Sequence, residues 1–417
     1  MEIKKKGPEV FNILFLLKSK KESAGVQNQL FLGEGFVLDS NPDLEKRKQT
    51  EKYEIMHMEK VVAKVSTSGD AHICQEQFMP YDLYLEEVEV PDIDTQINNL
   101  DNFYHWCASR VLSLDRAYAK EILNSIGVAQ AVTDKERAKI SMSYHCVSLT
   151  DVYWVRKEDE AITFAELNLY DNPLNEAIVE LSLKGRQMTV TNHQLLAPDL
   201  STKGCFPKAW IRTEDGFKLL KDGGEDEVRK ELLASKICQC FDFKQVIYNE
   251  YIYDDEVVTE SKIVSSKECS MVSKMAFDIY AANHDLNTLE VCKEIDRVSY
   301  YGMNILDYLT GNTDRHPENW GFYVDNNTNK YTELYPLMDF NQCFGSYDTI
   351  DGANCQPVLP QKMTQKEAAI EAVQAIGLRQ IAEVDMRWFD KMEHVKEMFV
   401  KRLTVLKEAD KARIKEV

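Results

Sequence analysis

The sequence has no long apolar run and no excess of positive charge. No window reaches the roughly 18 consecutive apolar residues that a membrane-spanning helix requires. The 69 Asp and Glu residues outnumber the 50 Lys and Arg residues, which gives a formal net charge of −19. A chain this acidic does not present a broad basic face to nucleic acid. We therefore expect neither a membrane span nor direct nucleic-acid binding, and a local basic groove is the alternative that the net charge leaves open.

Internal repeats and low-complexity segments are also absent from the 417 residues. Ten cysteines are scattered at irregular spacing, which is typical of free thiols in a reducing cytoplasm rather than of a disulfide framework. Cys238 and Cys240 form one close pair, but no second pair or His cluster completes a zinc site. With 44% hydrophobic and 29% charged residues, the composition is close to that of an ordinary soluble globular protein.

Hydrophobic periodicity divides the chain into a strand-rich part and a helical part. A DG pair at 215–216 marks a hairpin, and the segment 225–241 reads as a helix that follows it. Thr364 and Glu367 have capping-box spacing at the start of another helix. Strands are expected over 10–17, 29–38, 53–66, 81–90 and 153–155, one helix over 98–126, and mostly helices from about 275 onward.

This pattern predicts an α+β, two-lobed body. We expect a strand-rich accessory region with a helix over residues 1–140. A lobe containing the hairpin would follow over 141–272, and a helical lobe would complete the chain over 273–417.

One segment, residues 304–344, carries the most chemical information. An apolar helix ends at Gly311, a polar loop NTDRHPEN follows, and two short strands lead to Met338-Asp339-Phe340. Asp314 and Asn319 are five residues apart in the loop, and Asp339 lies at the expected end of the second strand. Phosphoryl transfer needs one carboxylate to orient a hydroxyl, and an amide oxygen and a second carboxylate to hold Mg²⁺. The alternative is a loop whose Asp and Asn only make turn hydrogen bonds.

The same residues carry a family resemblance. DRHPEN resembles the DRHxxN catalytic loop of phosphatidylinositol 3/4-kinases, and residues 312–319 resemble the N-T-D-x-H-x-x-N loop of the bacterial HipA-like kinases. Residues 335–339 are similar to the strand end that follows in that family, and residues 201–208 to its S-x-x-G-x-x-P-K loop. The resemblance covers the chain from about residue 140 onward, while the first 140 residues match no family that we can name.

The resemblance implies a bilobal protein-kinase-like fold that binds ATP and Mg²⁺. By motif position, Asp314 would be the catalytic aspartate, and Asn319 and Asp339 the metal ligands. Lys221 would contact the phosphates and Glu231 would hold that lysine. Lys218 and Glu227 are rivals for these two roles, and the sequence leaves the choice open.

The phosphate loop departs from the glycine loop of protein kinases, because it has no GxGxxG motif. Gly204 is the glycine available in residues 201–208 to let backbone N–H groups approach phosphate. In the HipA-like family this loop carries a serine that can be autophosphorylated, and Ser201 and Thr202 stand at the corresponding place here. Both also fit the plain interpretation of turn residues.

The sequence thus predicts a cytoplasmic, ATP- and Mg²⁺-dependent serine/threonine kinase that acts on a protein, with autophosphorylation as a further expectation. The resemblance also implies a small antitoxin-like regulatory partner. A nucleotide-binding pseudokinase and a kinase for a lipid or small-molecule hydroxyl are the alternatives. We interpret His316 as a residue that braces the loop rather than as a base, since Asp314 already supplies one. Arg315 can pair with a nearby carboxylate or with phosphate, and we favour a structural pairing.

Overall fold

The first described residues form an antiparallel sheet whose strands come from both sides of residue 140. A computed structural model describes residues 50–128, 131–172, 182–184, 201–202, 205–345 and 347–416 of the chain. The strand order is β3-β2-β1-β4. The four strands are β1 (Lys52–His57), β2 (Lys60–Ser66), β3 (Ala71–Ile73) and β4 (Tyr153–Lys157). The strand expected over 153–155 is therefore confirmed, and the segment 53–66 expected as a strand is a hairpin of two strands, β1 and β2. The domain boundaries at 140 and 272 stay predictions.

The strand predicted over residues 81–90 is wrong. Residues 81–90 alternate apolar and polar as a strand would, and Leu83 and Leu85 are indeed buried. The segment is nevertheless irregular, because the side chain of Asn99, rather than a neighbouring strand, bonds the backbone N–H and C=O of Glu86. The strands expected over 10–17 and 29–38 lie outside the described residues.

The single helix expected over 98–126 is two helices with an irregular link between them. The chain leaves the first helix at Arg110, whose guanidinium binds the Asp151 carboxylate at 2.7 and 2.9 Å and the Cys146 carbonyl at 2.6 Å. These tertiary contacts outweigh the helical periodicity. The helices of this part are α2 (Ile93–Ser109), α3 (Ala119–Ser125), α4 (Asp134–Met142) and α5 (Phe164–Leu167).

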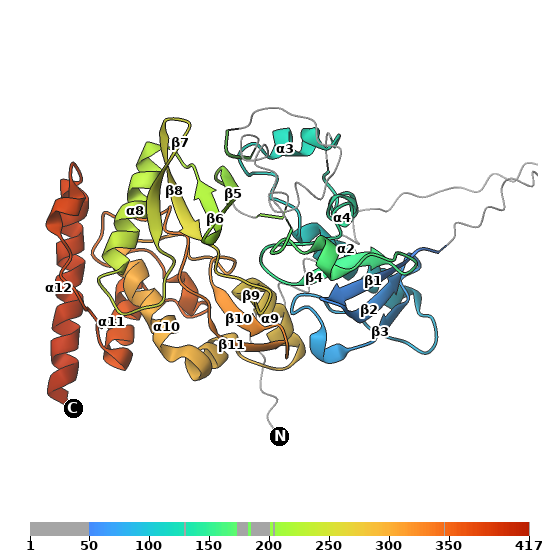
Figure 1. Cartoon of the computed structure of the whole chain (residues 1–417). Helices are drawn as coiled ribbons and strands as arrows, with labels where there is room; N and C mark the ends of the chain where they lie inside the picture. Colours follow the sequence, from blue (N-terminus) through green and yellow to red (C-terminus); the bar gives the residue numbers. More distant parts are fainter. Residues whose placement is uncertain are drawn as a thin grey trace, which may run out of the picture. The chain divides into compact units, whose positions relative to one another are not determined.

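A second antiparallel sheet contains the predicted hairpin and has the strand order β5-β6-β8-β7 (Figure 1). The hairpin turns at Gly216, whose φ of 105° is the left-handed conformation that glycine adopts without strain. Helix α8 (Glu225–Cys238) follows, with three acidic residues in its first turn, where they complement the helix dipole. The strands are β5 (Lys208–Thr213), β6 (Gly216–Lys221), β7 (Tyr248–Tyr253) and β8 (Glu256–Lys262).

The C-terminal part is mostly helical, as predicted, with one small sheet of order β11-β10-β9. The capping box of Thr364 and Glu367 forms as predicted, and its helix ends at Gly377. No helix in the described part of the chain is long and apolar enough to cross a membrane. The strands are β9 (Cys269–Ser273), β10 (Gly321–Asp325) and β11 (Lys330–Leu334), and the helices are α9 (Lys274–Asn283), α10 (Thr288–Thr310), α11 (Gln365–Ile376) and α12 (Glu393–Glu416).

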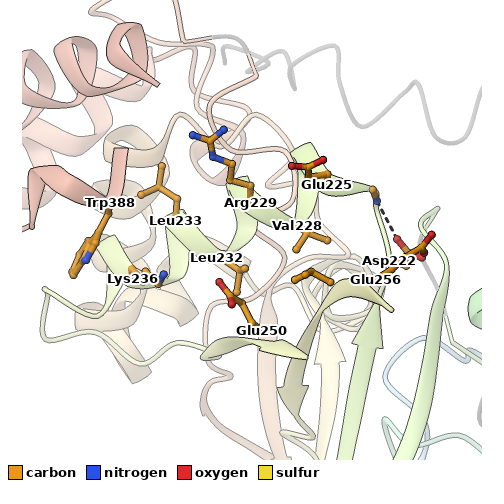
Figure 2. Close-up of a pocket in the computed structure, with 12 residues that line it drawn as sticks. Asp222, Glu225, Val228, Arg229, Leu232, Leu233, Lys236, Glu250, Glu256 and Trp388 are labelled. Atoms are coloured by element: carbon orange, nitrogen blue, oxygen red, sulfur yellow. Dashed lines mark hydrogen bonds between the residues drawn. The ribbon is translucent and has the colours of Figure 1, made fainter. Parts of the chain in front are cut away.

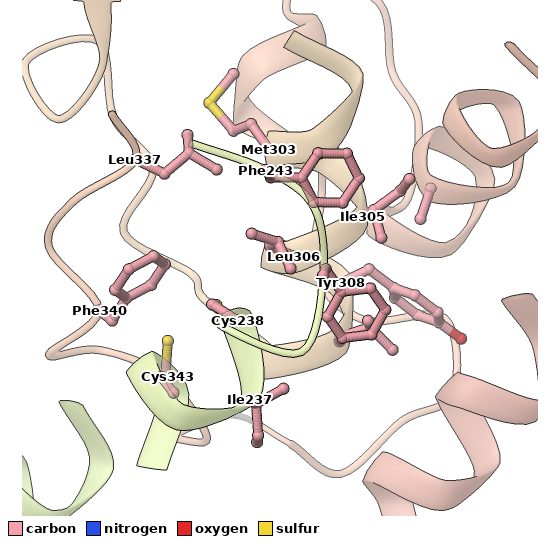
Figure 3. Packing of buried hydrophobic residues seen from close by; sticks show 14 of the residues in the cluster. Ile237, Cys238, Phe243, Met303, Ile305, Leu306, Tyr308, Leu337, Phe340 and Cys343 are labelled. Carbon is pink, nitrogen blue, oxygen red and sulfur yellow. The ribbon is translucent and has the colours of Figure 1, made fainter. Parts of the chain in front are cut away.

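The largest hydrophobic core joins α8 to the helical part. Figure 3 shows Ile237 and Cys238 of α8 beside Leu306 of α10, with Phe340 and Cys343 close by. All five side chains are buried and belong to one cluster. The sheet with α8 and the helices below it therefore share a core, and the α+β class predicted from the sequence is confirmed.

Candidate active site

The loop that follows α10 is fixed by its own side chains and by its neighbours. Helix α10 ends at Gly311, which has a left-handed conformation with φ of 60°. Asn312 then accepts a hydrogen bond from the Asp314 backbone N–H at 3.0 Å. The amides of Gln356 and Gln365 donate to the carbonyls of Thr313 and Asn312, at 2.8 and 2.6 Å. The backbone that carries Asp314 is thus held from two sides.

Arg315 connects this loop to two other segments. Its guanidinium is 1% exposed and binds the buried Asp307 carboxylate of α10 with N–O distances of 3.0 Å. A second edge donates to the carbonyls of Asn319, at 3.0 Å, and Met338, at 2.5 Å. A structural pairing for Arg315, preferred from the sequence, is what the structure contains. This one side chain sets the loop against the backbone that leads into Asp339.

Lys221, at the end of β6, lies between two carboxylates. Its Nζ is 2.9 Å from Glu231 Oε1 on α8 and 3.0 Å from Asp339 Oδ1. The other oxygen of Glu231 accepts a hydrogen bond of 2.6 Å from the hydroxyl of Thr259. All three charged groups are largely buried, with side-chain exposures of 8% for Lys221, 3% for Glu231 and 20% for Asp339. Residues 118 positions apart in sequence therefore meet in one ion cluster.

The rival residues have other partners. Lys218 binds Glu260 on the neighbouring strand, with N–O distances of 2.9 and 3.0 Å. Glu227 lies 3.8 Å from Lys230 on its own helix. The ion pair that the sequence left open is thus formed by Lys221 and Glu231. A separation of only ten residues suffices because α8 begins directly after the turn at Gly223 and Gly224.

The charges of this cluster stabilise one another. Burial alone would raise the pKa of Asp339, but Lys221 and Lys208 hold the pKa of that carboxyl well below its usual range. Burial would likewise lower the pKa of Lys221, but Asp339 and Glu231 hold it above its usual value. Asp339 therefore remains a carboxylate and Lys221 a cation at neutral pH.

The sequence suggested that Asp339 ends the second strand, but this prediction is wrong. Strand β11 ends at Leu334, and Asp339 follows in a loop with a left-handed φ of 61°. Its backbone N–H donates to the Tyr248 hydroxyl at 3.0 Å, and its carbonyl accepts from the Asn312 amide at 3.4 Å. Asp tolerates this backbone conformation better than most residues. The turn positions the carboxylate toward Lys221.

Asp314 and Asn319 lie in the same loop and contact each other. The Asn319 amide N donates to the Asp314 carbonyl at 2.8 Å, which fixes the Asn319 side chain and reserves its oxygen as a possible metal ligand. The Asp314 carboxylate is 42% exposed and lies 3.9 Å from His316 Nε2. Burial, with a further contribution from the charge of Asp339, raises the pKa of Asp314 although His316 opposes the shift. A carboxylate of raised pKa is a better proton acceptor.

Lys208 is a site residue that the sequence motif contained but to which we assigned no role. It pairs directly across the ladder with Lys221, so both side chains lie on the same face of the sheet. Lys208 is 5% exposed, and burial together with the charge of Lys221 lowers the pKa of its ammonium to about 8. The buried Arg116 donates to the Lys208 carbonyl at 2.5 Å and anchors this strand end. Strand register after the hairpin was the signal that could have identified Lys208.

Of the three residues predicted for the phosphate loop, the structure describes Ser201 and Thr202, whereas Gly204 lies outside the described residues. Ser201 is buried, and the Thr202 hydroxyl accepts a hydrogen bond of 2.9 Å from the Trp210 indole. Arg116 also binds the Thr202 carbonyl at 3.2 Å. Autophosphorylation of either hydroxyl stays a prediction and would require the loop to leave these contacts.

The donor set at the site suits a hard cation bound together with phosphate. No group of three or more His, Cys, Asp or Glu side chains in the described residues could hold a metal ion alone. Asn319 and Asp339 offer one amide oxygen and one carboxylate, which are oxygen ligands of the kind that Mg²⁺ prefers. Mg²⁺ is commonly held by one or two protein oxygens plus substrate phosphates. The residues present therefore fit Mg²⁺ bound as a nucleotide complex.

The site thus combines a paired lysine, a loop carboxylate and a set of oxygen donors. A search of curated proteins matches 122 residues, or 26% of this chain, to the serine/threonine-protein kinase CtkA of Helicobacter pylori, with 26% identity. The match spans 37% of the length of that relative. The resemblance to HipA-like serine/threonine kinases, predicted from the motifs, is thereby confirmed. No family model matches the chain.

Two solved structures are also similar. The crystal structure of the Helicobacter pylori proinflammatory kinase CtkA aligns with a TM-score of 0.39 and 15% identity, over 50% of this chain and 94% of that chain. HipA of Shewanella oneidensis, in a complex with HipB and operator DNA, aligns with a TM-score of 0.47 and 10% identity, over 87% of this chain and 96% of that chain. Both TM-scores lie below 0.5.

Proposed function

We propose that this chain is an ATP- and Mg²⁺-dependent kinase that transfers the γ-phosphoryl group to a serine or threonine hydroxyl of a protein. The observation that carries the proposal is the buried cluster in which Lys221 bridges Glu231 and Asp339. A lysine held in this way presents a fixed positive charge to the phosphates of a nucleotide. The similarity to a serine/threonine-protein kinase supports the choice of acceptor.

Lys208 would be a second cation for the triphosphate. It lies opposite Lys221 on the same face of the sheet, where like charges repel unless anions compensate them. Glu231 and Asp339 supply that compensation in the structure, and the phosphates would add to it in the complex. Two lysines at one strand end would stabilise more of the triphosphate charge than Lys221 alone.

Asp314 would act as the base. Its half-exposed carboxylate can orient the acceptor hydroxyl and take its proton as the phosphoryl group transfers. Asn319 and Asp339 would hold Mg²⁺, which supplies charge neutralisation at the phosphates when bound. Arg315 does no chemistry in this scheme, because its guanidinium is committed to Asp307 and to two backbone carbonyls. It acts as a positioning residue for the loop.

The decisive test is the substitution Asp314→Asn in the full chain. Transfer of label from γ-labelled ATP to the chain itself or to a generic protein acceptor should fall by roughly 10²–10⁴-fold, because the amide cannot accept the proton. Nucleotide affinity should remain, since Asp314 is not assigned to the phosphates or the metal. The product is identified by mass spectrometry as a phosphorylated serine or threonine.

A matched control for this test is Asp348→Asn, which alters an Asp whose side chain is 84% exposed. We expect it to leave transfer unchanged. Full transfer by Asp314→Asn would refute the base assignment. Nucleotide binding without any transfer by the unmodified chain would favour a pseudokinase, and a labelled lipid in place of labelled protein would change the acceptor.

A further inference from the structure

A cavity of about 580 Å³ lies beside α8. It is bounded by α8, by strands β7 and β8, and by Trp388 from a short helical turn of the C-terminal part (Met386–Phe389). Figure 2 shows Trp388 and Lys236 at one end of the cavity and Asp222 and Glu225 at the other. A volume of this size is typical of sites that bind a small molecule or a few side chains.

The floor of the cavity is apolar and its rim is mainly acidic. Val228, Leu232 and Leu233 of α8 line it together with Trp388 and with Val257, which is 49% exposed. The charged lining residues comprise four carboxylates and two cations, namely Asp222, Glu225, Glu250, Glu256, Arg229 and Lys236. Lys184 pairs with Asp222 and Glu256, so four carboxylates face three cations at the rim, which leaves one excess negative charge, with Glu225 and Glu250 exposed.

Strand β7 supplies a reason to expect a polypeptide in this cavity. It carries Glu250 and is the last strand of its sheet in the described part of the chain. The backbone of an edge strand can pair with an extended segment of another chain. An apolar side chain would enter over Leu232 and Trp388 while neighbouring basic residues meet the acidic rim.

We propose that this cavity binds a segment of a partner protein in which a bulky apolar side chain is flanked by Lys or Arg. The bound segment stabilises the position of α8 in which Glu231 pairs with Lys221, and this raises the rate of phosphoryl transfer. The binding site stands by itself, and its effect on catalysis rests on the proposed kinase function.

Helix geometry explains the coupling. At about 100° per residue, Leu233 and Lys236 lie roughly opposite Glu231 on α8, whereas Val228 and Leu232 lie about 60° and 100° from it, so the cavity lies mainly on the side turned away from Glu231. A segment bound on that side therefore contacts the helix that carries Glu231 without touching the nucleotide residues. Binding favours the position of α8 that pairs Glu231 with Lys221 only to the extent that the segment binds this position more tightly than a displaced one.

Binding is measured with fluorescein-labelled Lys-Lys-Phe-Lys-Lys and the full chain, by fluorescence anisotropy. We expect saturable binding, with affinity about tenfold lower for the double variant Glu225→Lys/Glu250→Lys, since two attractive contacts become repulsive. The matched control Glu371→Lys/Glu408→Lys makes the same charge change at exposed positions of α11 and α12 and should bind normally. The probes Glu-Glu-Phe-Glu-Glu and Lys-Lys-Ala-Lys-Lys should bind much more weakly.

If both double variants bound the phenylalanine probe with equal affinity, or if the alanine probe bound as tightly as the phenylalanine probe, the cavity would not be the proposed binding site. The effect on α8 is read independently by hydrogen exchange, where the phenylalanine probe should slow exchange of the α8 amides by at least about fivefold. Unchanged exchange despite saturable binding would overturn the proposed stabilisation of α8. If probe binding and slowed exchange occur but the chain transfers no phosphate, the proposed kinase function fails while the binding site stands.

Discussion

At the scale of single residues, buried charges define the candidate site. Arg315 and Asp307 are 1% and 3% exposed at the side chain, and they neutralise each other. A buried ion pair adds little net stability, but removal of one partner leaves a costly charge. The pair is therefore best understood as a device that fixes the loop geometry around Asp314 and Asn319.

Lys208 gives a stability prediction at the residue scale. Its pKa is lowered to about 8 from an ordinary value of 10.5, so between these pH values the folded chain releases a proton that the unfolded chain keeps. The unfolded state then binds more protons, and the free energy of unfolding rises with pH in this window. Relative to Lys208→Met, the wild type should gain on the order of 3 kcal/mol between pH 8 and 10.5. Urea unfolding at both pH values measures the difference.

If the difference in unfolding free energy between the wild type and Lys208→Met stayed constant from pH 8 to 10.5, the pKa of Lys208 would not be lowered. Lys218→Met is the control, because Lys218 lies on the same sheet but binds Glu260 near the surface. At pH 7, where Lys208 is mostly charged, Lys208→Met should also weaken binding of Mg²⁺-ATP by roughly tenfold if this lysine contacts the phosphates.

At the scale of elements, the end of α10 is decided by one glycine. Gly311 has a φ of 60°, and a Cβ built there would lie 2.3 Å from the Tyr347 ring. The helix end was readable from the sequence as an apolar helix followed by glycine. The proximity of Tyr347 was not, because it depends on how a later loop folds back over the helix.

Gly311→Ala should destabilise the chain by several kcal/mol, since backbone strain adds to a clash with a buried ring. Gly127→Ala is a matched control, because Gly127 also has a positive φ, of 76°, but a Cβ there would meet nothing within 4 Å. The control should lose only about 1 kcal/mol. Thermal or urea unfolding of both variants tests the prediction, and equal losses would contradict the role of the Tyr347 contact.

The sequence predicted most elements near the site but not all of their limits. The hairpin at 215–216, α8 and the helix from Thr364 were all readable, because each is set by local turn or cap chemistry. The periodic segment 98–126 misled us, because Arg110 leaves the helix to bind Asp151, 41 residues away. Local patterns cannot reveal a contact of that kind.

At the scale of the whole described chain, Asn329 joins the first sheet to the C-terminal part. In the turn between β10 and β11, its amide donates to the carbonyls of Gln77 and Met79 at 3.1 and 3.0 Å. Its side-chain oxygen accepts from the Tyr153 hydroxyl at 3.0 Å. Residues up to 252 positions apart thus meet at one asparagine.

Asn329→Ala should lose about 1–3 kcal/mol of unfolding free energy, because two part-buried hydrogen bonds to backbone carbonyls and the buried bond from the Tyr153 hydroxyl are lost. Hydrogen exchange should quicken around residues 77–79 and in the β10–β11 turn, but not in α8. Asn327→Ala, at an exposed position of the same turn, is the control. The two variants behaving alike would mean that Asn329 is not a link between the two parts.

The sequence by itself determined the loop chemistry, the α+β class and the kinase resemblance, because these depend on residue types at short spacing. The tertiary structure alone decided which lysine pairs with which glutamate, and it brought Lys208 beside Lys221. It also placed Asp339 in a loop rather than on a strand. Contacts between residues far apart depend on strand register, burial and the mutual neutralisation of charges, which no local pattern encodes.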